Sequence, residues 1–470
     1  MRILVLLFYF FPFVLICQTN YNITISNSSS WEGNLFFQRG GSNPRPVKII
    51  DSLHTEIFSD NFGMKGWDFK VNYNNKLSYF DRGSKGWFIM DSLQNEVDSI
   101  YCQNGYVADN HDFLALENGN YIIFAYDEQP YAMDTVVVGG DPNAIVEGLI
   151  IQELDSNHNL IFEWKSWDHF HVTENAYLSP WTNSSLPFIH ANAIDIDFDG
   201  NLIFSSRGLD EITKINRLTG EIIWRFGGTQ NQFSFINDYP FTHQHSIRSL
   251  GSNKYLLYDN GNYSQQYTGT INVSRAVEYE LDTILMTATK LWEFVHPDSL
   301  YTPSIGGVQR LPNGNTLINF GNLQWMNMGS IVTEVDSNNQ IVFQLEYNNG
   351  NNLYRAQKFD WFFYTPPALT YGCIDSSACN FDNFANSDDG SCDFPSGCDD
   401  PLYLEYDPSV TCGDQNDCIT LIINGLNNNI DEKNIYKITD ILGRNTLINK
   451  GRYHIIFFDD GSIEKQIILE

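Results

Sequence analysis

The sequence has little positive charge. Its 470 residues include 27 Lys and Arg against 57 Asp and Glu, which gives a net charge of −30. A protein that binds nucleic acid or an anionic membrane surface needs a basic face, so this composition excludes both as partners. An anionic small molecule would have to be bound by a local set of His and Arg side chains.

The sequence also lacks a membrane-spanning segment after its first residues. A span needs about 20 consecutive apolar residues, and no later run approaches that length. The N-terminus has Arg2, a mostly apolar stretch over residues 3–16 and polar residues from Gln18 onward. This pattern predicts a signal peptide over residues 1–17, with cleavage near Cys17 rather than a lipid anchor on it, and therefore an exported protein.

Helical periodicity is nearly absent from residue 21 to residue 364. Short runs of aromatic and β-branched residues alternate there with Gly, Asn and Asp, and aromatic residues make up 14% of the chain. Such runs bounded by turn residues are typical of strands. The composition excludes a disordered chain and predicts an all-β fold.

One unit recurs through this region. Its inner half, two apolar runs around a turn, occupies residues 113–124, 193–204, 247–257 and 308–318. Its outer half ends in an aromatic residue and occupies residues 152–164, 213–224, 278–292 and 333–343. Two more divergent copies of the unit occupy residues 35–58 and 67–97. Six four-stranded units of about 40 residues predict a six-bladed β-propeller over residues 18–366. A seven-bladed count and a stacked β-sandwich are the alternatives.

Cysteines are scarce in the repeats, where Cys102 stands alone, and six crowd the segment after Pro366-Pro367: Cys373, Cys379, Cys392, Cys398, Cys412 and Cys418. A dense, even set in an exported chain predicts disulfides in a small module over residues 367–420, and the spacing does not choose among the pairings. A zinc site is the weaker alternative, because the segment has no His and no C-x-x-C pair. The Asp388-Asp389-Gly390 cluster is interpreted as a solvated turn, with Ca²⁺ binding as its alternative.

The last fifty residues, 421–470, alternate short apolar runs with turns. Strands are expected over residues 435–438, 453–458 and 467–469. The pattern predicts a separate small β domain, and a strand pair that closes the propeller is the alternative.

Histidines and an asparagine occupy equivalent positions in the repeat. His111 lies five residues before Leu116, and His245 lies five residues before Leu250. In the unit between them, Asn192 holds this position. Two imidazoles at one repeat position are harder to explain as structural residues than one alone.

His190 and His243 lie two residues before Asn192 and His245. Positions i and i−2 of a strand point to the same face, and the innermost strands of a propeller line its axis. We therefore expect the side chains of His111, His190, Asn192 and His245 to converge on one axial funnel from three units.

Arg207 ends the second strand of its hairpin and is expected at the same face. In the sixth unit, Gly306 holds the position of Asn192 in its unit and would leave space for a ligand. No metal is predicted, because the set lacks a clear acidic ligand group, although three histidines are compatible with Zn²⁺ or Cu²⁺. His169 and His171 lie in an insertion between units and are interpreted as surface residues.

Several segments resemble the aryl sulfotransferase family: His190-Ala191-Asn192, Asp199-Gly200-Asn201-Leu202, Ser205-Ser206-Arg207, Thr219-Gly220-Glu221, Trp224-Arg225, Gly227-Gly228 and Gln244-His245. The resemblance covers most of the propeller and is strongest from residue 190 to residue 262, while the first two units match poorly. It implies a periplasmic or secreted six-bladed propeller that moves a sulfuryl group between phenols without a cofactor. The chain has no Gly-Lys dipeptide, and nucleotide-dependent sulfotransferases need a phosphate-cradling loop.

The resemblance also implies the roles of individual residues. His245 would be the nucleophile of a ping-pong reaction that passes through a sulfohistidine. His111, His190, Asn192 and Arg207 would surround the sulfuryl oxygens and stabilise the charge that develops on them. Substrate-binding positions are then expected at His243 and Gly306, and the small-molecule partners would be an aryl sulfate donor and a phenol acceptor.

The C-terminal segments resemble other secreted proteins. The Cys-rich segment is similar to a short disulfide module of marine Bacteroidetes, in one good copy and one degraded copy. Residues 440–444, Asp-Ile-Leu-Gly-Arg, resemble the core of a type IX secretion sorting domain. These resemblances imply a secretion-machinery partner and a secreted or surface-attached protein.

Two other functions are compatible with the same sequence. One is a non-catalytic secreted propeller that binds carbohydrate or a cell surface, because a fold does not determine a function. The other is a metal-dependent propeller hydrolase or lyase. Turnover of an aryl sulfate distinguishes the sulfotransferase from the first, and stoichiometric bound transition metal would favour the second.

Overall fold

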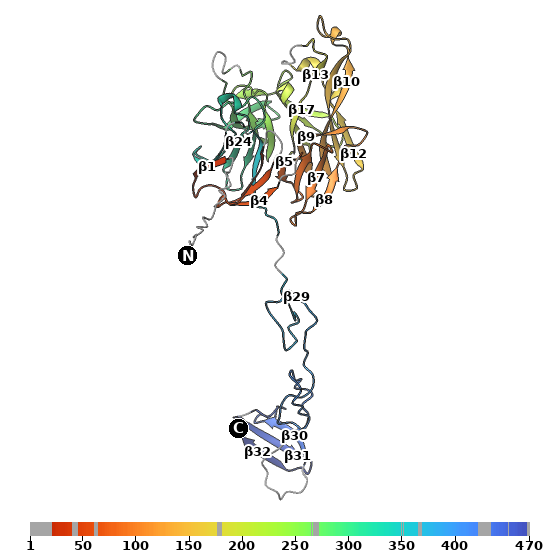
Figure 1. The fold of residues 1–470 in the computed structure, drawn as a ribbon, viewed down its shortest axis with the longest axis vertical. Coiled ribbons are helices and arrows are strands. Elements are labelled where there is room, and N and C mark those ends of the chain that lie inside the picture. The colour runs from red at the N-terminus through yellow and green to blue at the C-terminus, as the bar shows by residue number, and fades with distance from the viewer. Residues whose placement is uncertain are drawn as a thin grey trace, which may run out of the picture. The chain divides into compact units, whose positions relative to one another are not determined.

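The structure is a computed structural model that describes residues 21–39, 46–60, 64–175, 181–264, 266, 272–348, 350, 352–364, 369–421, 434–449 and 451–467. The chain divides into two compact units, Met1–Thr365 and Pro366–Glu470 (Figure 1). The predicted signal peptide and the Pro366-Pro367 pair lie outside the described residues. Within them, no helix has the length and apolarity needed to cross a membrane.

Unit 1 is all-β, and six sheets with an antiparallel four-stranded core can be followed through its described residues. The first three sheets contain β2 (Asn34–Arg39), β3 (Val47–Ile50), β4 (Glu56–Asp60) and β27 (Leu353–Phe359); β5 (Lys65–Val71), β6 (Leu77–Asp81), β7 (Gly86–Met90) and β8 (Glu96–Ile100); and β9 (Val107–Ala115), β10 (Tyr121–Tyr131), β11 (Ala144–Leu154) and β12 (Leu160–Lys165), with β13 (Ser185–Pro187) parallel to β11.

The other three sheets contain β14 (Ala191–Ile196), β15 (Leu202–Ser206), β16 (Glu211–Ile215) and β17 (Ile222–Gly227); β19 (His245–Gly251), β20 (Lys254–Asp259), β21 (Arg275–Asp282) and β22 (Thr287–Val295), with β18 (Ser234–Ile236) parallel to β22; and β23 (Gly307–Arg310), β24 (Thr316–Phe320), β25 (Ile331–Val335), β26 (Ile341–Tyr347) and β1 (Tyr21–Ser26). Short 3₁₀ helices lie at Met133–Thr135, Ser166–Asp168, Val172–Glu174, Arg207–Leu209 and Gln324–Met326.

The repeated turns connect the first two strands of several sheets. Gly119, Gly200 and Gly314 have φ values of +86°, +83° and +89°, and Asn253 has +59°. This left-handed conformation is what tight hairpin turns require and what Gly and Asn adopt most easily. The local sequence therefore explains why β9–β10, β14–β15, β19–β20 and β23–β24 form hairpins.

The first strand of each sheet contacts the first strands of two neighbouring sheets. These contacts run β5–β9–β14–β19–β23–β27 and return from β27 to β5, so the six strands form a closed ring. We call them the inner strands. The apolar core lies between consecutive sheets; Ile122 and Leu149 of one sheet, for example, belong to one cluster with Ile194 and Phe204 of the next.

Strands from the two ends of unit 1 complete two of the sheets. The copy over residues 35–58 supplies only β2, β3 and β4, and its inner strand is β27, which pairs antiparallel with β2. Conversely, β1 pairs with β26 at the outer edge of the last sheet. Among the described residues, β30 (Ile435–Asp440), β31 (Tyr453–Phe458) and β32 (Ile463–Ile467) pair only with one another.

A buried group of charged residues joins the inner strands. Asp112 on β9 forms ion pairs with Lys70 of β5, Arg248 of β19 and Arg355 of β27. Asp68 of β5 lies 2.7 Å from both Lys70 and Arg355. Because buried charges are costly unless paired, these contacts fix the relative positions of strands that are distant in sequence.

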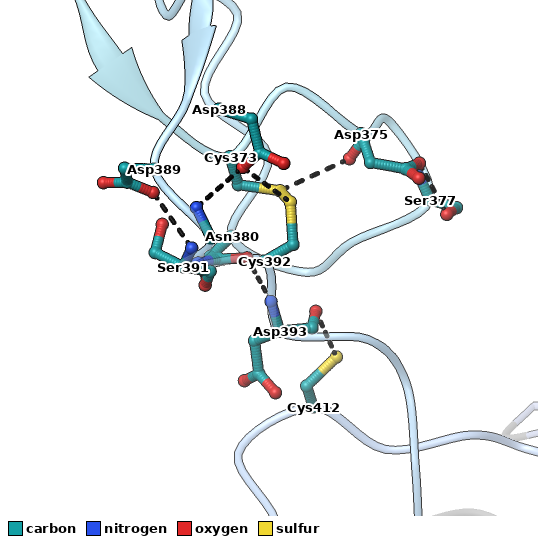
Figure 2. The surroundings of a disulfide bond; sticks show 11 residues. Cys373, Asp375, Ser377, Asn380, Asp388, Asp389, Ser391, Cys392, Asp393 and Cys412 are labelled. Atoms are coloured by element: carbon teal, nitrogen blue, oxygen red, sulfur yellow. Dashed lines mark hydrogen bonds between the residues drawn. A yellow bond between two sulfur atoms is a disulfide. The ribbon is translucent and has the colours of Figure 1, made fainter.

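Unit 2 has three disulfides and a small sheet. The disulfides pair Cys373 with Cys392, Cys379 with Cys412 and Cys398 with Cys418. Figure 2 shows the first, surrounded by hydrogen-bonded acidic turns. Short strands lie at β28 (Tyr371–Gly372) and β29 (Ser387–Asp388), and a three-stranded sheet contains β30 (Ile435–Asp440), β31 (Tyr453–Phe458) and β32 (Ile463–Ile467). The disulfides predicted for the Cys-rich segment are confirmed.

Candidate functional site

A cavity of about 400 Å³ lies where the inner strands begin. Its walls are formed by Trp67, Arg82, Asn110, His111, His190, Arg207, His245, Ser304, Ile305 and Tyr354. Each of the six sheets contributes a residue from its inner strand or from the segment just before it. The cavity is therefore placed by the ring of inner strands and not by a single loop.

Four of the predicted site residues line this cavity: His111, His190, Arg207 and His245. None of the lining residues is acidic, although the chain as a whole carries a net charge of −30. The guanidinium groups of Arg82 and Arg207 make the cavity an electropositive pocket in an acidic protein, and the three imidazoles add ring nitrogens to its wall. Such a pocket suits an anionic ligand.

His245 has one ring nitrogen engaged behind it. Its Nδ1 lies 2.7 Å from Asn260 Oδ1 and 3.1 Å from the backbone oxygen of His243, and no partner for its Nε2 is found among the described residues. Burial, followed by the charge of Arg207, lowers the pKa of His245 well below 6.5. The imidazole is therefore neutral at neutral pH and keeps a nitrogen lone pair.

His190 and His111 lie together in the wall of the cavity. Their ring centroids are 4.9 Å apart. Burial, together with His111 and Arg207, lowers the pKa of His190 to about 3. His111 Nδ1 lies 2.6 Å from Asp109 Oδ1. Burial raises the pKa of this carboxyl group, but the interactions with His111 outweigh it and lower the pKa of Asp109 overall.

Arg207 is held by few contacts. It follows β15 directly, and its Nη2 donates to the backbone oxygen of Pro303 at 3.2 Å. Its buried Nε has no hydrogen-bond partner, and it makes no ion pair, as far as the described part of the chain shows. Burial lowers the pKa of Arg207 from its ordinary value, yet a guanidinium remains charged at neutral pH. A partly buried cation with an unused donor is suited to an anion.

Asn192 and His243 do not line the cavity, so the expected common face of positions i and i−2 is not observed. Asn192 is fully buried, and its Nδ2 donates to the backbone oxygen of Gln244. The His243 ring lies 3.0 Å from Asp210 and packs on Tyr263. The pairing of β14 and β19 with their neighbours is irregular at these positions, and His190 and His243 have φ values of +48° and +55°. The alternation of side chains between two faces fails because His190 and His243 do not have strand conformation.

Gly306 does not line the cavity either, although its neighbour Ile305 does. A Cβ atom at Gly306 would lie 2.4 Å from the Tyr258 ring. Its φ of +124° also disfavours other residues. The missing side chain thus makes room for Tyr258. His169 stacks on Trp164 and His171 caps a 3₁₀ helix, and neither lines the cavity.

The residues around the cavity that were not expected from the sequence include Trp67, Arg82, Asn260 and Tyr354. Arg82 and Asn260 each follow the second strand of their sheet directly, as Arg207 does, so the repeat register that singled out Arg207 would also have found them. Trp67 supports Arg82, whose guanidinium lies 4.0 Å from the indole ring centroid. Tyr354, whose hydroxyl donates to the His111 backbone oxygen, carried no local signal.

No cluster of three or more His, Cys, Asp or Glu side chains arranged to hold a metal ion occurs in the described ranges. His111 and His190 adjoin each other, but the third nearby nitrogen donor, His245, is turned toward Asn260 through Nδ1.

Comparison with known proteins identifies one family model, described as arylsulfotransferase (ASST), which matches residues 52–355. A search of curated proteins found no match. Among solved structures, a protein of unknown function from Bacteroides caccae is 12% identical with a TM-score of 0.43, and the match covers 69% of this chain and 98% of that chain.

Two further solved structures are similar at the level of the chain trace. A catalytically inactive virginiamycin B lyase from Staphylococcus aureus with Quinupristin is 11% identical with a TM-score of 0.35, covering 70% of this chain and 88% of that chain. The Cps50 (Swd1) β-propeller domain from Myceliophteria thermophila is 10% identical with a TM-score of 0.38, covering 72% and 89%.

Proposed function

Because the chain belongs to the arylsulfotransferase family, we propose that it moves a sulfuryl group from a phenolic sulfate ester to a phenol in two steps, through a sulfohistidine at His245. The observation that carries the proposal is the His245 ring itself. It is neutral, it has a nitrogen without a partner among the described residues, and it lies in a cavity that is electropositive and has no acidic lining residue.

In the first step, a lone pair of His245 forms a bond to sulfur while the sulfur–oxygen bond to the aryl group breaks. The bonding electrons leave with the aryl oxygen, and a phenolate with a pKa of about 10 is a far better leaving group than an alkoxide. Sulfuryl transfer is similar to phosphoryl transfer, in which positioning and stabilisation of the spread charge dominate. Arg207 and His190 are the donors for the sulfuryl oxygens.

His111 is placed to serve the aryl oxygen. The contact between its Nδ1 and Asp109 Oδ1 orients the ring. In this proposal the ring gives a proton to the leaving phenolate in the first step and takes one from the acceptor phenol in the second. Asn192, although it does not line the cavity, supports the site by its bond to the backbone of Gln244, the residue before His245.

We propose that the six sheets of unit 1 are the blades of a six-bladed propeller, closed by β1 and β27. The closed ring of inner strands and the apolar clusters between consecutive sheets support this. Residues 367–420 would form a disulfide linker and residues 421–470 a type IX sorting domain that delivers the protein to the cell surface or the medium. The three disulfides of unit 2 support an oxidising destination.

The experiment is mass spectrometry of the protein mixed with a nitrophenyl sulfate and no acceptor, then denatured. A sulfo group on the peptide that contains His245 is expected, together with release of one equivalent of nitrophenol, and neither should appear in the His245→Asn variant. His296→Asn is the matched control, because His296 is equally buried but bonds Gln344 outside the cavity. An unmodified His245 peptide during turnover would contradict the proposal.

A further inference from the structure

Asn260 lies directly behind the proposed nucleophile, and the role inferred for it rests on the proposed sulfuryl transfer through His245. Its Oδ1 is 2.7 Å from His245 Nδ1, and the backbone oxygen of His243 is 3.1 Å from the same nitrogen. Both partners are acceptors and cannot donate. Only an Nδ1–H group satisfies them, so the neutral ring carries its proton on Nδ1.

The orientation of the Asn260 amide is itself fixed. Its Nδ2 donates to the backbone oxygens of Thr302 and Ile305 at 2.7 and 3.0 Å. A flipped amide would direct its oxygen at these two carbonyls and its NH₂ group at the His245 ring. Asn260 is fully buried, and an unpaired polar group there would be costly. The contacts with residues 302 and 305 therefore ensure that an acceptor faces Nδ1.

We propose that Asn260 is a positioning residue that keeps the ring proton of His245 on Nδ1 throughout the reaction, leaving Nε2 to take the sulfuryl group. A bond from Nε2 to sulfur leaves the ring with a positive charge and its proton still on Nδ1. In the second step, the acceptor oxygen attacks sulfur, and the nitrogen–sulfur bond breaks to release a neutral imidazole, which is a good leaving group.

The neutral amide matters as much as its position. A carboxylate at this place would stabilise the protonated free ring, which has no lone pair for attack. It would also accept the Nδ1 proton from the sulfated ring, so that an anionic imidazolide would have to leave. The other charged or titratable groups that face His245 are Arg207, His190 and His111. The cation Arg207 opposes protonation of the ring, and Asn260 adds no negative charge against it.

The first test uses the parent protein and needs no turnover. Two-bond ¹H–¹⁵N spectra of the protein labelled in His, with the His245→Asn variant to assign the signal, report which nitrogen is protonated. The expected result is a neutral ring with the proton on Nδ1 from pH 6 to pH 8. A proton on Nε2 overturns the inference, even if the protein transfers sulfuryl groups; a proton on Nδ1 supports it, even if the protein does not.

The second test is the pH dependence of nitrophenol release in the Asn260→Asp variant. A carboxylate near an imidazole shifts its pKa by about one to three units, so the acid limb of the rate should move to higher pH by that amount. Asn319→Asp is the matched control: Asn319 is also fully buried and donates to two backbone oxygens, of Leu353 and Tyr354, but it does not contact His245.

The control separates a role in positioning from a role in folding. The Asn319→Asp variant should lose stability with no shift of the acid limb, whereas the Asn260→Asp variant should show the shift in its folded fraction. An unmoved limb in folded Asn260→Asp protein overturns the inference. If that variant does not fold, the spectrum of the parent protein decides.

Discussion

Removal from bulk water keeps His190 and His245 uncharged, and this is what gives the cavity its chemistry. An imidazolium has no lone pair for attack. Bulk water would stabilise this charged form and so reduce the fraction of rings that are neutral and nucleophilic. Arg207 reinforces the effect at both histidines. In the proposed mechanism the fixed cation of Arg207 also supplies the donor that an anionic sulfuryl group requires.

Replacing Arg207 with Met should lower kcat/KM for aryl sulfates by about 10²–10³, the usual cost of removing one donor to a developing charge. The loss should appear mainly in kcat if Arg207 binds the transition state more tightly than the substrate. Arg217→Met is the control, because Arg217 pairs with Glu153 outside the cavity. Steady-state kinetics of both variants are the measurement. If the Arg207→Met variant were as active as the Arg217→Met control, Arg207 would not bind the sulfuryl group.

The depressed pKa of His190 also predicts how stability depends on pH. The folded pKa is about 3, against 6.5 for an unperturbed imidazole. Between these values the unfolded chain binds the proton and the folded one does not, so His190 lowers stability as the pH falls. The contribution is at most about 1.4 kcal/mol per pH unit.

The His190→Gln variant should therefore lose less stability than the parent between roughly pH 6 and pH 4. Urea unfolding at several pH values, followed by fluorescence, measures the difference. Parallel pH profiles for the two proteins would mean that His190 is already protonated in the folded state.

At the scale of elements, the inner strands pair regularly along most of their length, but the backbone that leads into β14 and β19 has an irregular conformation. The turn at Asp199-Gly200 fixes the β14–β15 hairpin, but the chain enters β14 through His190 in a left-handed conformation. Non-glycine residues in that conformation are uncommon and often lie at functional sites. The irregular starts allow His190 and His245 to face the cavity while Asn192 is packed beneath it.

The ion-pair group around Asp112 should be essential to the inner ring. Arg355→Met would remove one cation from the buried carboxylates of Asp68 and Asp112. It would also remove the bond to the Asn192 backbone, while Lys70 and Arg248 remain in the group. Breaking a buried pair from one side costs about 3–5 kcal/mol.

Arg310→Met, which breaks the partly exposed pair with Glu278, should cost less than about 1 kcal/mol. Urea unfolding of unit 1 compares the two variants. Equal losses would show that the buried pairs add no more than surface ones.

At the scale of the whole molecule, unit 1 is closed by both ends of its own sequence. The inner strand β27 comes after all the other inner strands yet pairs with β2. It also brings Tyr354 to the cavity and Arg355 to the ion-pair group. The module that follows adds no strand to the sheets of unit 1 among the described residues.

Two truncations test this division. A chain that ends after Tyr364 should fold and keep its sulfotransferase activity, but should no longer be released or attached at the cell surface. A chain that ends after Asn352 lacks β27 and should not fold. Circular dichroism, kinetics and cell fractionation are the measurements. Loss of folding in the longer chain would mean that unit 2 helps to close unit 1.

The sequence by itself determined the strands, the repeated hairpins and the repeat position shared by His111 and His245. These features depend on local turn chemistry and on the alternation of apolar residues, which act over a few positions. Tertiary structure decided the pairing of β27 with β2, the disulfide pairs, and the place of Tyr354 at the cavity. It also decided that Asn192 and His243 do not line the cavity. Such contacts join residues far apart in the chain, or depend on single backbone angles set by packing, and no local pattern encodes them.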